Sequence, residues 1–120
     1  MPEINLTPQT QQILMQLQTF QQQIQTIGMQ KESLNMQNME IEKALEELKK
    51  TPEKDEVYKA VGPILVRSNK KELEKDLEEK RETVSLRIKS LEKQDDKLRE
   101  KMREVQGKLE GMIKTSQKED

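Results

Sequence analysis

Apolar residues recur at alternating intervals of four and three from Ile13 to Leu48, and this spacing restricts the fold more than any other feature. Every position in the series is apolar except Lys31 and Asn38. A heptad period sustained over this length predicts a helix that forms one strand of a coiled coil. Thr7 suits an N-cap. We therefore expect a helix over residues 7–50 that follows a loose tail at residues 1–6.

A second helix is predicted over residues 69–114. Asn69 followed three residues later by Glu72 has the capping-box pattern that begins a helix. Gly107 and Gly111 predict that the last turns fray, and residues 115–120 are expected to form a polar tail. The apolar residues of this helix recur at every seventh position, at Leu77, Val84, Leu91, Leu98, Val105 and Met112.

Between the two helices, residues 55–68 are the part of the chain that resembles β structure. Gly62 and Pro63 give a turn signal, and β-forming residues flank it at Val57, Tyr58, Val61, Ile64, Leu65 and Val66. A single two-stranded hairpin is barely stable in water and leaves strand edges unpaired. These six residues are therefore candidates for an oligomerisation element.

A hairpin at this place folds the two helices back on each other. The expected fold is mainly α, a long antiparallel two-helix coiled coil joined by a short β-hairpin, in one domain of 120 residues. Helices of nearly equal length would bring both termini to the end opposite the hairpin. This pairing places Asn38 near Arg81. Both are polar residues in the heptad seam, the line of core positions along which the two helices pack, and we expect them to fix the helix register.

Composition excludes most enzyme classes. The chain has no Cys and no His, so it lacks the side chains of Cys/His metal sites and of most nucleophile–base pairs. Adjacent acids such as Glu46 and Glu47 diverge on a helix, and they are better explained as a solvated face. We expect no enzyme activity, no metal and no cofactor. Full disorder is the competing explanation of a chain that is 38% charged, and the sustained heptads argue against it.

Charge and hydropathy also bear on location and partners. The net charge is −1, and the basic residues of the second helix alternate with acids, so neither nucleic acid nor membrane is expected as a partner. No apolar run is long enough to span a bilayer, and the first residues lack the pattern of a secretory signal. A cytoplasmic location is the expectation.

Two apolar surfaces are candidates for binding other proteins. One is the tip where the two helices end, and its residues are Leu6, Ile13, Leu14, Leu17, Leu109, Met112 and Ile113. The other is a stripe formed by Met15, Met29 and Met36, which occupy the outermost heptad position of a charge-poor helix. The alternatives remain open: the tip residues close the coiled coil, and the methionines are helix formers or are covered by neighbouring subunits.

The hairpin and the heptads that follow it resemble a known family. The stretch Val57–Val66, VYKAVGPILV, followed by LEKDLEEKRETVSLRIKSLEKQ at Leu73–Gln94, is similar to β-class prefoldin subunits, above all the archaeal form. The resemblance covers nearly the whole chain. A connector with room for one hairpin fits the β class, because α-class subunits carry two.

The resemblance implies a hexamer of two α-class and four β-class subunits. In that family the hairpins join into a double β-barrel platform, and six coiled-coil arms hold unfolded client proteins at their distal ends without ATP and deliver them to a group II chaperonin. The expected function is therefore that of a holdase chaperone subunit. Two alternatives are a structural coiled-coil scaffold or tether, which would not protect unrelated proteins, and a helical arm that binds RNA, which would bind it with a steep salt dependence.

Overall fold

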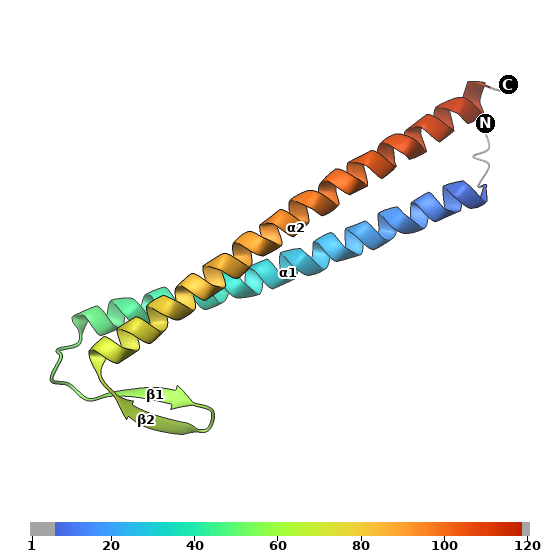
Figure 1. Ribbon diagram of the computed structural model, residues 1–120. Coiled ribbons are helices and arrows are strands. Elements are labelled where there is room, and N and C mark those ends of the chain that lie inside the picture. The colour runs from blue at the N-terminus through green and yellow to red at the C-terminus, as the bar shows by residue number, and fades with distance from the viewer. Residues whose placement is uncertain (1–6, 119–120) are drawn as a thin grey trace. The chain divides into compact units, whose positions relative to one another are not determined.

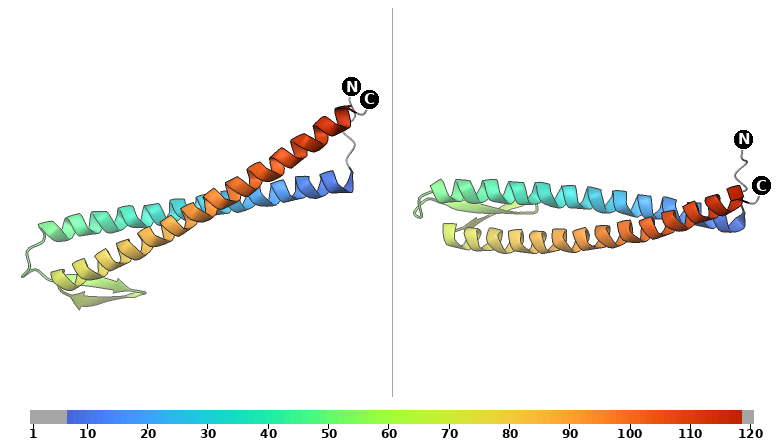
Figure 2. Two further views of the ribbon diagram at one scale, coloured as in Figure 1. Left: turned by 45° about the horizontal axis from the view of Figure 1, so that its top comes forward. Right: turned by 90° about the horizontal axis from the view of Figure 1, so that it is seen from above.

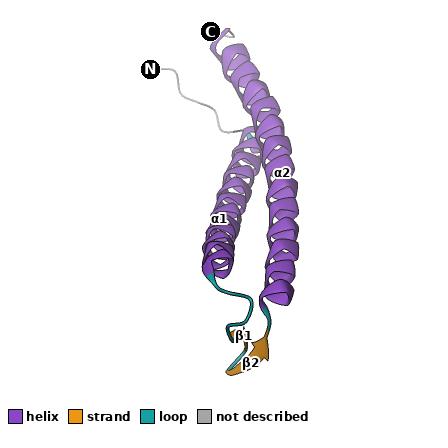
Figure 3. Cartoon of the chain, turned by 90° about the vertical axis from the view of Figure 1, so that its left-hand side faces the viewer, coloured by secondary structure: helices purple, strands orange, loops and turns teal. Residues whose placement is uncertain are grey.

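Two long helices and one hairpin make up the described part of the protein. The computed structural model describes residues 7–118, and the side chains of residues 7–114. Along the chain it contains α1 (Pro8–Lys50), β1 (Val57–Val61), β2 (Ile64–Ser68) and α2 (Lys70–Lys118), as Figure 1 shows. Figure 3 shows how loops join the two strands to the ends of the helices. The mainly helical fold expected from the heptads and the turn signal is confirmed.

Both helices begin at capped residues. Thr7 accepts a hydrogen bond from the backbone N–H of Thr10 at 3.2 Å, and Pro8 follows as the first helical residue. At the start of α2, Asn69 Oδ1 accepts from the backbone N–H of Glu72 at 2.9 Å. These bonds satisfy N–H groups that a helix cannot satisfy internally. The local sequence therefore determines where each helix starts.

Contacts between residues divide the chain into two compact units. The terminal unit comprises Met1–Gln30 and Leu91–Asp120, and the hairpin unit comprises Lys31–Ser90. In the hairpin unit, residues 31–50 of α1 run beside residues 70–90 of α2 in both views of Figure 2. In the terminal unit the helical segments are antiparallel, so α1 begins at the same end at which α2 finishes (Figure 1).

The heptad seam is the core of both units. Every seam position of α1 from Ile13 to Leu48 is buried or half-buried, including the polar Lys31 and Asn38. On α2, Arg81 is the seam position that is exposed. The apolar residues with the lowest exposure are Ile27 and Leu91 in the terminal unit, and Ile41, Leu45, Leu48 and Val84 in the hairpin unit.

Two expectations about α2 were wrong. Asn38 does not pair with Arg81: its Nδ2 donates to Ser85 Oγ at 3.1 Å, about one helical turn further along α2. The last turns are also helical through Gly107 and Gly111 to Lys118, where an end near residue 114 was expected. Half-buried Val105 and Leu109 keep the heptad seam through this segment, and their packing offsets the low helix propensity of glycine.

Candidate interaction surfaces

The hairpin has a two-residue loop and a regular antiparallel register. Val57 pairs with Ser68 and Val61 with Ile64 in antiparallel register, which leaves Gly62 and Pro63 as the two-residue loop. Gly62 has a φ of +56°. A positive φ followed by the fixed negative φ of proline is the combination that a type II′ turn has, and this turn matches the twist of paired strands.

The apolar residues of the hairpin are largely open to solvent. Leu65 is 73% exposed, and Tyr58, Val61, Ile64 and Val66 are exposed as well, while Val57 is half-buried. The structure thus brings together the six residues predicted as the oligomerisation element. Each strand also pairs with one neighbour alone within the described part of the chain, so each has an outer edge with free backbone groups.

Polar contacts on the hairpin hold its open end in shape. The Glu56 carboxylate accepts a hydrogen bond from the Tyr58 hydroxyl at 2.8 Å and forms an ion pair with Arg67 at 2.6 Å. Tyr58 and Arg67 are a cross-strand pair in the register. The Glu56 carboxylate therefore links Tyr58 on β1 to Arg67, its cross-strand partner on β2.

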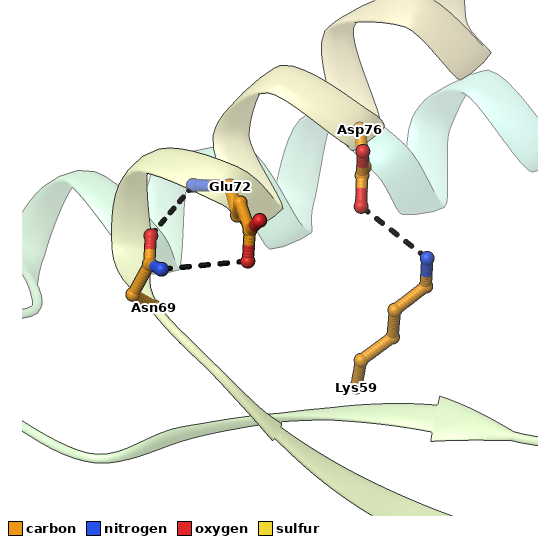
Figure 4. Close-up of polar contacts among 4 residues, drawn as sticks. All are labelled: Lys59, Asn69, Glu72 and Asp76. Atoms are coloured by element: carbon orange, nitrogen blue, oxygen red, sulfur yellow. Dashed lines mark hydrogen bonds and ion pairs between the residues drawn. The ribbon is translucent and has the colours of Figure 1, made fainter.

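A second contact connects the hairpin to the helix that follows. Lys59 Nζ lies 3.3 Å from an Asp76 carboxylate oxygen on α2, beside the Asn69–Glu72 cap (Figure 4). Both side chains are about half exposed, so this ion pair contributes at most about 1 kcal/mol. At the other end of the connector, Lys70 Nζ donates to the carbonyl oxygen of Lys49 at 3.4 Å, which places a cation at the C-terminal end of α1.

A groove of about 770 Å³ lies between β1 and the helices of the hairpin unit. Its apolar lining comes from both sides, with Ala44, Leu48, Leu73 and Leu77 on the helices and Val57 and Ala60 on the strand. Leu48 is buried and Ala44, Val57, Leu73 and Leu77 are half-buried, so Ala60 is the exposed member of this apolar lining. The groove therefore marks where one side of the hairpin lies against the helices, and the exposed apolar area is on the rest of the hairpin.

The tip residues predicted from the sequence fall together at one end of the terminal unit. Ile13, Leu17, Leu109, Met112 and Ile113 are half-buried, and Leu14 is exposed. Leu6 lies outside the described residues. Beyond Ile27 on α1 and Leu91 on α2, the apolar seam residues toward the tip are half-buried, whereas Thr10, three residues before Ile13, is buried at 7% exposure. The apolar side chains of the seam are therefore more open to solvent there than Ile27 and Leu91 are.

The predicted methionine stripe lies on the exposed side of α1. Met15 and Met29 are each 66% exposed, and Met36 is 58% exposed. Sequence reasoning missed Met39, which is 59% exposed and lies three residues after Met36 on a neighbouring part of the helix surface. It also missed exposed Leu86 on α2. Both are large apolar residues at heptad positions outside the seam, and this pattern in the sequence could have predicted their exposure.

Two further kinds of feature were sought among the described residues, a metal site and a membrane-spanning helix. Among these residues, no group of His, Cys, Asp and Glu is placed to hold a metal ion. Nor does any helix in this part of the chain have the length and hydropathy to cross a membrane. The features that remain are the exposed hairpin, the open tip and the methionines.

Comparison with known proteins agrees with this architecture. Residues 11–116 match the family model described as prefoldin subunit. The prefoldin subunit beta of Archaeoglobus fulgidus is 44% identical over 108 residues, which are 90% of this chain and 93% of the relative. The prefoldin subunit beta of Methanocella arvoryzae is 51% identical over 108 residues, 90% of this chain and 86% of the relative.

A solved structure shares the fold. The crystal structure of the prefoldin beta subunit from Thermococcus strain KS-1 superposes with a TM-score of 0.82 at 37% sequence identity. The match covers 90% of this chain and 95% of that chain.

Proposed function

The chain belongs to the prefoldin family of chaperone subunits, and on this premise we propose that it is an ATP-independent holdase. In this role the tips of its coiled-coil arm capture unfolded proteins and deliver them to a group II chaperonin. The tip residues named above, Leu6 included, are the proposed contacts. The stripe of Met15, Met29 and Met36 on α1 forms a second contact surface for the same clients.

The open seam of the terminal unit is the observation that carries this proposal. Ile13, Leu17, Leu109 and Met112 belong to the seam by sequence, yet each keeps part of its surface in water. An unfolded chain exposes apolar side chains in no fixed arrangement. Partly covered apolar residues at the end of a helix pair offer such a chain contact area without a closed pocket.

The hairpin supports the assembly part of the proposal. Its exposed apolar residues and unpaired strand edges fit strand addition by neighbouring subunits. We propose that the partner is an α-class prefoldin subunit, in a hexamer of two α-class and four β-class chains with a shared β-barrel platform. Several arms held on one platform raise the effective concentration of tips around a client, so weak single contacts add up to useful affinity.

The test is an aggregation assay with a chemically unfolded, unrelated enzyme diluted into buffer without ATP. The chain is measured alone, with an α-class partner, and with that partner after removal of residues 1–14 and 108–120. We expect the complex to suppress aggregation, the chain alone to do so poorly, and the truncated complex to lose most of the effect. Transfer is measured by adding a group II chaperonin with ATP and following recovery of enzyme activity.

A milder variant separates client binding from folding of the tip. The double substitution Leu109→Gln and Ile113→Gln makes two half-buried tip positions polar, and Leu86→Gln is the matched control at an exposed position outside the tip. If the complex assembles and does not suppress aggregation, the protein is a coiled-coil scaffold and the holdase proposal fails. If tip variants suppress aggregation as well as the parent, the tip is not the client surface.

A further inference from the structure

The methionines of the described chain fall into two sets with different surroundings. Met15 and Met29 in the terminal unit, and Met36 and Met39 in the hairpin unit, are 58–66% exposed on α1. Met102 and Met112 are half-buried seam residues of α2. The chain has no cysteine, so the thioethers of methionine are its only sulfur groups. Oxidants that act on sulfur therefore meet the exposed set first.

The helix surface around Met15 and Met29 is uncharged and rich in glutamine. Residues 8–30 contain no Asp, Glu, Lys or Arg, and Gln22 occupies the outermost heptad position between the two methionines. On this surface the methionine side chains are the apolar groups that project furthest from the seam. A change in their polarity alone would change the character of the whole face.

We propose that Met15, Met29, Met36 and Met39 are a modification site: oxidation by a hydroperoxide makes the exposed apolar side chains of α1 polar and lowers client holding, while the coiled coil stays folded. This inference rests on the proposed holdase function. We name the four residues the exposed methionine set.

The chemistry balances with a hydroperoxide as the oxidant. The thioether sulfur attacks the outer oxygen, the S–O bond forms, and the O–O bond breaks. Sulfur gives up two electrons, and the peroxide is reduced to water or an alcohol, which takes the proton. Reversal requires a dithiol reductant and a sulfoxide reductase: the dithiol becomes a disulfide and the oxygen leaves as water. Because the chain has no cysteine, that reductant must come from another molecule.

The fold tolerates this change for a geometric reason. The four side chains lie off the seam, so a sulfoxide oxygen there points to water and does not enter the packing between α1 and α2. Methionine sulfoxide resembles glutamine in length and in its polar oxygen, and glutamine is a good helix former that already occupies position 22. Oxidation of Met102 or Met112 would instead place a polar group in the seam.

The experiment uses the complex with its α-class partner, treated with graded hydrogen peroxide. Peptide mass spectrometry follows each methionine, thermal unfolding follows the fold, and the aggregation assay follows function. We expect oxidation of the exposed methionine set to run about threefold or more faster than that of Met102 and Met112. Aggregation suppression should fall roughly twofold or more while Tm stays unchanged. Sulfoxide reductase with dithiothreitol should restore it.

Two variants make the assignment specific. Replacing all four residues with leucine keeps the face apolar and cannot be oxidised, so suppression should persist in peroxide. Replacing all four with glutamine imitates the oxidised face and should reduce suppression without any peroxide. The α-class partner is the same in every arm, so loss from its own methionines appears equally in the leucine variant.

Several outcomes would overturn the proposal. One is a leucine variant that loses aggregation suppression in peroxide as the parent does, and another is a glutamine variant with full aggregation suppression. The others are a Tm that falls in parallel with aggregation suppression, and oxidation of Met102 and Met112 that is faster than that of the exposed methionine set. Failure of the holdase proposal is seen separately, because the untreated complex would then not suppress aggregation at all.

Discussion

Asn38 of α1 donates a hydrogen bond to the Ser85 hydroxyl of α2 at 3.1 Å, and this bond joins a side chain of each helix across the seam. The Asn38 amide oxygen is buried and has no hydrogen-bond partner there. A polar pair in an apolar seam stabilises one register at the expense of others, because a shift leaves both groups unpaired.

The first prediction tests this pair. Ser85→Ala removes the acceptor and leaves a half-buried amide unsatisfied, whereas Ser90→Ala makes the same chemical change at an exposed site of the same helix. Because both variants gain the same helix propensity, the difference between their free energies of unfolding measures the contribution of the hydrogen bond. We expect Ser85→Ala to be less stable than Ser90→Ala by about 1 kcal/mol in chemical denaturation. Equal stability of the two variants would show that the bond does not contribute.

The second prediction concerns glycine inside α2. A Cβ built on Gly107 meets nothing within 4 Å, and its φ is not positive. Gly107→Ala should therefore raise the free energy of unfolding by about 1 kcal/mol. Gly62→Ala is the contrasting variant: open space surrounds it as well, but its φ is +56°, so alanine there should destabilise the hairpin. Thermal unfolding at fixed protein concentration measures both.

The third prediction concerns the start of α2. Asn69→Ala removes the oxygen that accepts from the Glu72 N–H, and it should cost about 1 kcal/mol of stability, while Asn69→Ser should restore most of it. Asn35→Ala is the control, because Asn35 is an exposed residue inside α1, where alanine favours the helix. Destabilisation of similar size at both sites would contradict a capping role for Asn69.

The fourth prediction separates assembly from folding. Leu65→Lys puts a charge on the most exposed apolar residue of the hairpin, so the isolated chain should keep its helix content by circular dichroism. Burial of that charge in a neighbouring subunit would be costly, and we expect the complex with an α-class partner to dissociate in size-exclusion chromatography with light scattering. Met29→Lys, at a similarly exposed site of the terminal unit, should assemble normally.

The helices were predictable because their signals are local. Thr7 and Asn69 carry capping side chains, and the four–three spacing selects the residues that become buried, down to the half-buried Lys31. Register was not predictable in this way. Heptads repeat, so a shift of one turn still pairs apolar with apolar residues, and the choice of Ser85 over Arg81 depends on a contact between distant segments.

The hairpin could be predicted from the sequence, but its contact with α2 could not. The six hairpin residues share a β-forming character that the sequence displays, but the contact of Lys59 with Asp76 depends on how the hairpin folds against α2. The end of α2 was predicted wrongly because local helix propensity was given more weight than packing. Local propensity at Gly107 and Gly111 favours fraying, and the apolar seam on both sides of Gly107 outweighs it.

Tyr58 is the only tyrosine of the chain, which contains no tryptophan, and it lies on the hairpin with half of its surface in water. The phenol ring is therefore the natural chromophore of the protein near 280 nm. Its emission reports the surroundings of the hairpin, which include the groove between β1 and the helices. An engineered label is unnecessary: in mixtures with a partner that has neither tyrosine nor tryptophan, intrinsic fluorescence would follow the docking of this one element in real time.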